Sequence, residues 1–220
     1  MYAIQTRSHA GEGSTNEDVF GYRYHPQSPS CCICVLADGQ GGHAGGQRAA
    51  QLTCSTIINA ATALQPDLLS QPLAWTDLLY HADQTLYESP RAGLTTVVAL
   101  CITPWWVCGA SCGDSEALLM MENKAIFLTQ HQTKKPPMGS GLASITPFGN
   151  KLKPQWLLLM MSDGVWKYAG WPRIKTLLSS HNSSDAIDQI EQLARLPGTG
   201  AFQDDFTLLL AQPHPTPPQP

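Results

Sequence analysis

Four aspartates stand where apolar, strand-like segments end or begin, and this placement could serve metal chemistry. Asp38 follows VLA, Asp114 lies in the turn of GASCGDS, Asp163 follows WLLLMMS, and Asp204 precedes DFTLLL. Antiparallel strands leave and return at the same edge of a sheet, so Asp38, Asp163 and Asp204 can meet at one rim. Carboxylates brought together repel, and burial adds a desolvation cost. A divalent cation would offset both, and ligation by oxygen alone selects Mg²⁺ or Mn²⁺ over zinc or copper.

A glycine-rich run, VLADGQGGHAGG at residues 35–46, surrounds the first of these aspartates. We interpret Asp38 as a metal ligand and the carbonyl of Gly39 as another, because glycine tolerates backbone conformations that are closed to other residues. The later glycines would keep the rim open and let a helix start nearby. His43 indicates a structural hydrogen bond near that helix start, with general acid as the alternative. A single Asp-Gly pair is ordinary turn chemistry, but its repetition beside several apolar strands weakens that simpler interpretation.

Apolar patterning predicts an α+β fold in which antiparallel sheets are covered by helices. Strands dominate both ends of the chain and two long helices follow one another, which is not the alternation that a parallel sheet requires. The predicted strands are 1–7, 19–24, 31–37, 94–102, 105–111, 116–121, 125–129, 155–161 and 206–211. The predicted helices are 44–64, 72–87, 171–180 and 184–196, and residues 130–153 are predicted to form a loop.

Composition predicts one domain at residues 1–211 and a proline-rich, disordered tail at residues 212–220. The 220 residues are 14% charged with a net charge of -4, and no basic cluster exceeds Lys134-Lys135. We therefore expect no binding to nucleic acid. The sequence shows no 18-residue apolar span and no basic-then-apolar leader, so we expect no membrane contact and a cytoplasmic location. The seven cysteines are expected to be buried, reduced thiols.

Six stretches form an ordered series along residues 1–211. They are NEDVFGY at 16–22, VLADGQGGHAGG at 35–46, GLTTVVAL at 93–100, GDS at 113–115, LLLMMSDGVW at 157–166 and DDFTLLL at 204–210. The series resembles the metal-dependent serine/threonine protein phosphatases of type 2C, in their bacterial form. The resemblance implies a four-layer α-β-β-α sandwich with metals at one end. It also implies hydrolysis of phosphoserine and phosphothreonine in proteins, opposing a cognate Ser/Thr kinase.

The resemblance also implies a role for each matching acidic position. Asp38 would bridge two Mn²⁺ or Mg²⁺ ions, the carbonyl of Gly39 would bind one of them, and Asp163 and Asp204 would hold the other. Asp38, Asp163 and Asp204 are therefore the expected catalytic set. In this family a metal-activated water, rather than a protein nucleophile, attacks phosphorus in line.

Three further acidic residues receive outer roles from the same resemblance. Asp114 would help to bind a third, weaker metal ion. Glu17 and Asp18 would hold metal-bound waters in a second shell. Lys167 stands where the family usually has another aspartate, which opposes binding of the third metal.

The sequence also departs from the family where substrate would bind. Gly13 stands where the family usually has an arginine that clamps the substrate phosphate, so Arg7 or Arg48 would have to supply that contact. The segment at 130–153 is shorter than the family's flap and lacks its helical pattern. These departures motivate an alternative function, a catalytically weak pseudophosphatase that acts as a regulatory or binding module.

Two other enzyme classes fit the sequence less well. Residues 39–44 match the dinucleotide-binding pattern GxGxxA. However, Asp38 would repel a pyrophosphate, and no second strand ending in an acid follows about 20 residues later. A phosphatase that uses an aspartyl nucleophile would need an Asp-x-Asp pair, which residues 37–40 lack.

Overall fold

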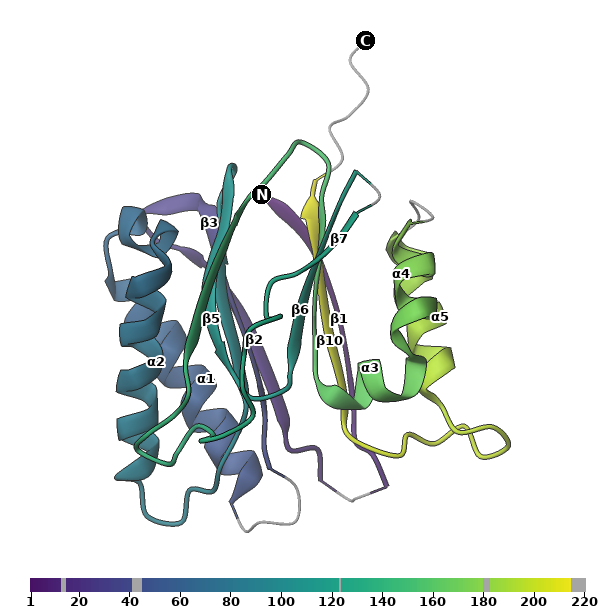
Figure 1. The fold of residues 1–220 in the computed structure, drawn as a ribbon, viewed down its shortest axis with the longest axis horizontal. Coiled ribbons are helices and arrows are strands. Elements are labelled where there is room, and N and C mark those ends of the chain that lie inside the picture. Colours follow the sequence, from purple (N-terminus) through teal and green to yellow (C-terminus); the bar gives the residue numbers. More distant parts are fainter. Residues whose placement is uncertain (13–14, 41–44, 123, 180–182, 215–220) are drawn as a thin grey trace.

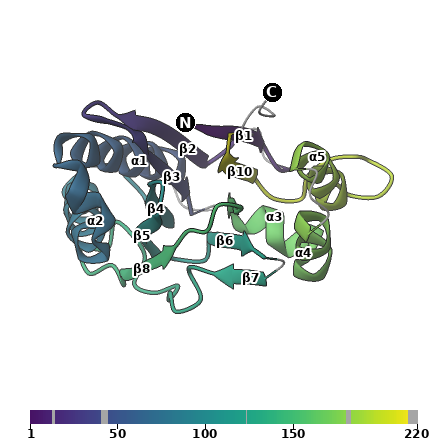
Figure 2. The same ribbon diagram turned by 90° about the horizontal axis from the view of Figure 1, so that it is seen from above.

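Two five-stranded antiparallel sheets lie face to face in the computed structural model, and helices cover both outer faces (Figures 1 and 2). The structure describes residues 1–12, 15–40, 45–122, 124–179 and 183–214. One sheet has the strand order β1-β10-β9-β6-β7, and the other has the order β2-β3-β4-β5-β8. The predicted four-layer α-β-β-α sandwich is therefore confirmed.

Each sheet draws its strands from both halves of the chain. The first sheet contains β1 (Tyr2–His9), β10 (Phe206–Pro213), β9 (Leu157–Met161), β6 (Glu116–Met121) and β7 (Lys124–Phe127). The second contains β2 (Asp18–His25), β3 (Ser28–Asp38), β4 (Val97–Ile102), β5 (Trp106–Cys112) and β8 (Thr146–Lys151). The second sheet is covered by α1 (Gly46–Ala63) and α2 (Pro72–Tyr87), joined by the short 3₁₀ helix η1 (Pro66–Ser70). The first is covered by α3 (Asp163–Ala169), α4 (Trp171–Ser179) and α5 (Ser183–Ala194).

The apolar run of β3 is buried on both of its faces. Odd-numbered residues from Cys31 to Val35 pack toward α1 and α2, whereas even-numbered residues from Cys32 to Leu36 fill the space between the sheets. Because side chains alternate along a strand, burial on both faces requires a continuous apolar run. A third apolar cluster lies between the first sheet and helices α3 to α5. All seven cysteines are buried and free, as predicted.

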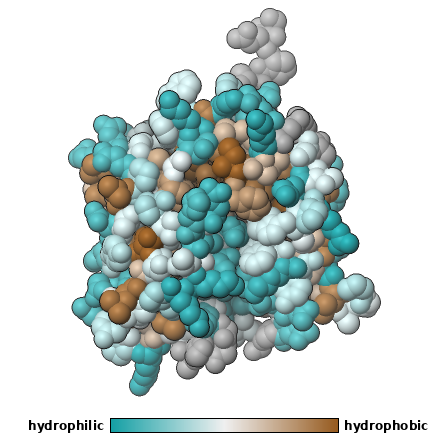
Figure 3. All heavy atoms as spheres, viewed as in Figure 1, coloured by the Kyte–Doolittle hydropathy of each residue, from teal (hydrophilic) through white to brown (hydrophobic). Residues whose placement is uncertain are grey.

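Apolar side chains of the described residues form three buried clusters inside the protein. On the face shown in Figure 3, most side chains are hydrophilic and the apolar ones gather in several small patches. The three internal clusters therefore account for the packing of the layers. No helix in the described ranges is both long and apolar enough to cross a membrane, and the cytoplasmic location stays a prediction.

The structure differs from the predicted elements at four places. β8 lies inside the segment that the sequence predicts to be a loop. Its sequence TPFGNK contains proline and glycine, which argue against a strand but are tolerated in β8 because it lies at an edge of its sheet. The short helices α3 and η1 were not predicted. β10 continues to Pro213, past the predicted domain end at Ala211, because its last residues pair with β1. Residues 215–220 lie outside the described part of the chain, so the disordered tail stays a prediction.

Candidate active site

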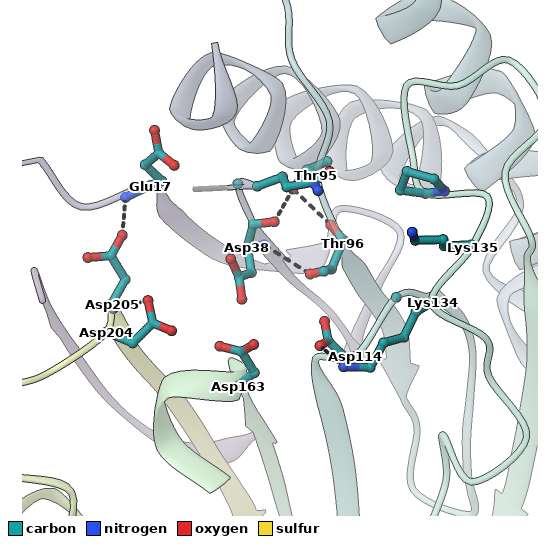
Figure 4. Close-up of a pocket in the computed structure, with 14 residues that line it drawn as sticks. Glu17, Asp38, Thr95, Thr96, Asp114, Lys134, Lys135, Asp163, Asp204 and Asp205 are labelled. Atoms are coloured by element: carbon teal, nitrogen blue, oxygen red, sulfur yellow. Dashed lines mark hydrogen bonds and ion pairs between the residues drawn. The ribbon is translucent and has the colours of Figure 1, made fainter. Parts of the chain in front are cut away.

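A cavity of about 490 Å³ opens at one end of the sandwich, where segments from both sheets meet (Figure 4). Its lining among the described residues is strongly charged. It includes six acidic residues and two lysines, namely Glu17, Asp38, Asp114, Asp163, Asp204, Asp205, Lys134 and Lys135. The four aspartates that follow or precede the apolar strands in the sequence therefore share one pocket.

Each of these four aspartates is positioned by the end of a regular element. Asp38 is the last residue of β3, and Asp163 is the first residue of α3, directly after β9. Asp204 lies two residues before β10, and Asp114 lies in the turn between β5 and β6. Figure 4 shows their carboxylates pointing into the same space. Within the described ranges, however, no group of three or more His, Cys, Asp or Glu side chains forms a ready-made metal site.

The backbone of Asp38 is fixed by two threonines that precede β4. The Thr96 N–H and the Thr95 hydroxyl both donate to the carbonyl of Asp38, at 2.8 and 2.7 Å. The Asp38 N–H donates to Oγ1 of Thr96 at 3.2 Å. These bonds leave the Asp38 carboxylate free to face the pocket (Figure 4). Thr95 and Thr96 lie in the stretch GLTTVVAL at 93–100, but nothing in the sequence predicts their contact with Asp38.

Burial and crowding both disfavour the ionised form of Asp38. Burial is the larger cause that raises its pKa well above the usual range, and the charges of Asp18, Asp163, Asp114 and Asp204 raise it further. Asp204 also has a raised pKa, through burial and then through Asp163. A divalent cation would remove this repulsion, so the electrostatics of the pocket fit a bound metal ion.

Asp18 lies opposite Asp38 in the register of β2 and β3. It is 7% exposed, and no backbone N–H or well-aligned side-chain donor reaches either of its carboxylate oxygens. Burial raises its pKa to about 7, although the hydroxyls of Ser162 and Thr207 act in the opposite direction. A buried carboxylate with only two weakly placed hydroxyls near it is costly to ionise. This unsatisfied acid beside Asp38 is a second observation that fits a cation in the pocket.

Gly39 permits a close approach between the end of β3 and the start of α1. A Cβ at this position would lie 2.5 Å from the backbone of Gly46 and 2.9 Å from the carbonyl oxygen of Glu17. No other residue fits there without a backbone shift, which gives a structural reason for this glycine. The neighbouring positions 41–44, including His43, and position 13 lie outside the described residues, so the roles predicted for them stay predictions.

Asp205 anchors the N-terminal segment beside the pocket. Its carboxylate accepts backbone N–H groups from Gly11 at 2.8 Å and from Glu17 at 2.6 Å. The Glu17 side chain has one buried oxygen without a hydrogen-bond partner, and burial followed by the charge of Asp205 raises its pKa. Asp205 thus fixes the position of Glu17 relative to Asp204.

Two lysines pair with acids of the pocket. Lys167 bonds to Asp163 one helical turn earlier in α3, and Nζ of Lys134 lies 2.6 Å from Oδ2 of Asp114. Burial acts to lower the pKa of Lys167, but the hydrogen bond and the charge of Asp163 outweigh it, so the pKa is raised. The backbone of Asp114 also accepts the indole N–H of Trp166 at 3.1 Å.

Comparison with known proteins identifies the family. The family model described as Stage II sporulation protein E (SpoIIE) matches residues 28–214. The chain belongs to the SpoIIE family. No curated protein sequence matches it.

Solved structures share the fold of this SpoIIE-family chain over nearly its whole length. A bacterial serine phosphatase in which one arginine is replaced by alanine is 27% identical, with a TM-score of 0.81 and coverage of 97% of this chain and 99% of that chain. The serine/threonine phosphatase PstP/Ppp of Mycobacterium tuberculosis is 19% identical, with a TM-score of 0.78 and coverage of 97% and 99%. PppA of Pseudomonas aeruginosa is 19% identical, with a TM-score of 0.74 and coverage of 96% of both chains. The predicted resemblance to bacterial type 2C phosphatases is confirmed.

The two arginines expected to bind phosphate lie outside the pocket of this SpoIIE-family chain. Arg7, in β1, is held by Asp188 at 2.7 Å and by Glu191 at 3.4 Å, both from α5. Arg48 is exposed on α1 and is not among the residues that line the cavity. The cations of the described lining are Lys134 and Lys135 instead. In the sequence this pair is only the largest basic cluster, because nothing there indicates that the loop at 128–145 lies over the pocket.

Proposed function

We propose that this chain is a phosphatase that hydrolyses phosphoserine and phosphothreonine in proteins and requires Mn²⁺ or Mg²⁺. The burial of Asp38 among four other aspartates in one pocket is the observation that carries the proposal. Membership of a family with a type 2C-like fold, and a structural relative that is a serine phosphatase at 27% identity, support it.

The metal ions would be held by oxygen ligands from four positions. These are the carboxylates of Asp38, Asp163 and Asp204 and the carbonyl of Gly39. When bound, the ions supply an acidified water and offset the charge that develops on the phosphoryl group. Thr95 and Thr96 hold the Asp38 backbone in position for this role.

Asp18 and Glu17 would orient water from behind this ligand set, since each has a buried oxygen without a protein donor. A third metal at Asp114 would have to displace the ammonium group of Lys134. The substrates would be phosphorylated proteins, with a Ser/Thr kinase as the opposing enzyme and the cytoplasm as the location.

Hydrolysis of p-nitrophenyl phosphate and of a phosphoserine peptide, each with and without Mn²⁺, tests the function. We expect metal-stimulated turnover in the wild type and its loss in Asp38→Ala. Asp188→Ala is the matched control, because Asp188 is an exposed acid that pairs with Arg7 outside the pocket. The control should retain wild-type turnover.

The pseudophosphatase remains a second candidate because two of the acids that face the pocket, Asp163 and Asp114, already have lysine partners. Absence of metal-stimulated turnover in the folded wild type, on both substrates, would favour it over the enzyme.

A further inference from the structure

Lys134 presents an ammonium group at the pocket with bonding capacity to spare. Its side chain is 64% exposed, and its Nζ lies 2.6 Å from Oδ2 of Asp114. An ammonium group has three donors, and this ion pair uses one of them. The remaining donors are available to an anion that enters the cavity. Asp114 thus holds the Lys134 ammonium group at the pocket and uses only one of its three donors.

The loop at residues 128–145, between β7 and β8, is tied down just before Lys134. The Gln132 side-chain amide donates to the carbonyl of Ser115 at 2.8 Å, and the Gly113 N–H donates to the carbonyl of Thr133 at 3.1 Å. Gly113 and Ser115 flank Asp114 in the turn between β5 and β6. Lys134 and its carboxylate partner are therefore parts of one hydrogen-bonded unit.

The same loop is tied to the Asp38 side of the pocket just after Lys135. Met138 and Thr95 exchange backbone hydrogen bonds at 3.1 and 3.2 Å. Thr95 is also the residue whose hydroxyl binds the carbonyl of Asp38. The loop thus bridges the two walls of the cavity, with the lysines between its attachment points (Figure 4).

A buried carboxylate on α2 holds the far side of the loop. Asp83 has 0% exposure, and it accepts the backbone N–H groups of Gly139, Gly141 and Ala143 at 2.6, 3.3 and 3.1 Å. Three backbone donors on one carboxylate form a strong local anchor. Because this anchor restricts the loop, a lysine on it loses little entropy when it binds an anion.

The other cations near the described part of the pocket are less suited to bind phosphate. Arg7 is held by two carboxylates of α5, and Lys167 is bonded to Asp163, one of the proposed metal ligands. Lys135 also lines the pocket, but none of the ion pairs among the described residues holds its ammonium group in place. Lys134 combines a fixed position with free donors.

We infer that Lys134 binds the phosphoryl oxygens of the substrate, in place of the arginine that the family resemblance expects at position 13, and that Asp83 is a positioning residue that acts through the loop. The inference rests on the proposed phosphatase function for its substrate. Phosphate binding itself can be measured without turnover.

Lys134→Gln tests the inference, with Lys134→Arg as the conservative variant and Lys153→Gln as the matched control. Lys153 forms an ion pair of the same length, 2.6 Å, with Glu122 away from the active-site cavity. We expect Lys134→Gln to raise KM for an aryl phosphate, with Mn²⁺ present, by about tenfold, with kcat changed by less than about threefold. Calorimetric titration of inorganic phosphate into the Mg²⁺-loaded protein should show a similar rise in Kd. For Lys134→Arg, KM and the phosphate Kd should stay within about threefold of the wild-type values. For Lys153→Gln, both constants should equal those of the wild type.

An unchanged phosphate Kd in folded Lys134→Gln would overturn the inference and leave Lys134 only as the partner of Asp114. If that variant does not fold, acetylation of wild-type lysines, with and without phosphate, decides the question. Phosphate should protect Lys134 and leave Lys153 unprotected, and equal labelling of Lys134 in both conditions would overturn the inference. If the wild type binds phosphate through Lys134 but hydrolyses nothing, the proposed function fails and the binding site stands.

Discussion

Two buried acidic regions of this molecule differ in how their charge is satisfied. Asp83, within α2, accepts three backbone N–H groups from the loop at 128–145. Asp18, opposite Asp38, accepts no backbone N–H, and burial raises its pKa to about 7 although the hydroxyls of Ser162 and Thr207 act to lower it. Both are almost completely shielded from solvent, at 0% and 7% exposure. Burial therefore does not distinguish a structural acid from a functional one, whereas the supply of donors does.

Asp18 and Asp38 lack a positively charged partner within the described part of the chain. Among the ion pairs of the described residues, none includes Asp18 or Asp38, although Asp163 and Asp114 each have a lysine. A bound cation would stabilise the negative charges of Asp18 and Asp38, as three backbone N–H groups stabilise that of Asp83. Changing each acid should consequently give opposite results, which the following experiments measure.

The largest expected effect comes from Asp38→Asn, which removes one negative charge and keeps the shape of the side chain. Loss of a metal ligand should lower kcat/KM by at least about a hundredfold. The same change should raise the melting temperature of the metal-free protein, because it relieves repulsion among buried carboxylates. Kinetics with Mn²⁺ and thermal melts in EDTA check both effects. A lower melting temperature in EDTA would contradict the comparison.

Asp83→Ala should have the opposite effect on stability. It leaves three backbone N–H groups without their acceptor, so the free energy of unfolding should fall by about 3 kcal/mol, at about 1 kcal/mol for each hydrogen bond. Urea denaturation should show the same loss with and without Mn²⁺. Asp77→Ala, an exposed acid on the same helix, is the control and should be neutral. A loss of stability that Mn²⁺ restores would place Asp83 in the metal site instead.

The stability of the metal-free protein should depend on pH through Asp18. Its pKa is raised from 3.8 to about 7 in the folded state, so its contribution to stability is fully present below about pH 4 and is lost as the pH rises through 7. The free energy of unfolding should therefore fall by up to about 1.4 kcal/mol per pH unit over this window. Urea denaturation in EDTA at several pH values measures the slope. Asp38 and Asp204 also have raised pKa values and contribute to the slope, so Asp18→Asn should reduce it without abolishing it. A slope unaffected by this substitution would contradict the assignment.

The smallest expected effect is on phosphate affinity, and it tests whether Asp83 positions Lys134 or only stabilises the fold. Asp83→Asn should weaken phosphate binding by about threefold in the wild-type background and have no effect on it in the Lys134→Gln background. Calorimetry with inorganic phosphate on the four proteins completes the cycle. Equal, additive losses in both backgrounds would show that Asp83 does not act through Lys134.

Local pattern predicted antiparallel sheets covered by helices and acids gathered at one rim, whereas the four-layer order of the sandwich was implied by the family resemblance. The apolar runs of β3 and β9 are each followed closely by an Asp-Gly pair, so the predicted ends of both strands lie within one residue of the observed ends. β8 was missed because an edge strand with proline and glycine has little pattern of its own.

The contacts across the pocket could not be predicted in the same way. Asp83 lies 56 positions before Gly139, which it binds, and a single acid on a helix gives no signal of a distant loop partner. Lys134 likewise reaches the pocket only because the loop at 128–145 folds against the turn that carries Asp114. Arg7 shows the converse case, since a residue close in sequence to the acidic motif is drawn away by acids of α5.

Titration of Mn²⁺ into the wild type and into Asp38→Asn, followed by electron paramagnetic resonance of the free ion, tests the central claim most directly. The claim is that the acids of the pocket are gathered to hold a divalent cation. We expect saturable Mn²⁺ binding to the wild type, with an accompanying rise in melting temperature, and affinity weakened by at least about tenfold in Asp38→Asn. Wild-type protein that leaves all the Mn²⁺ free, or Asp38→Asn that binds it equally well, would contradict the claim.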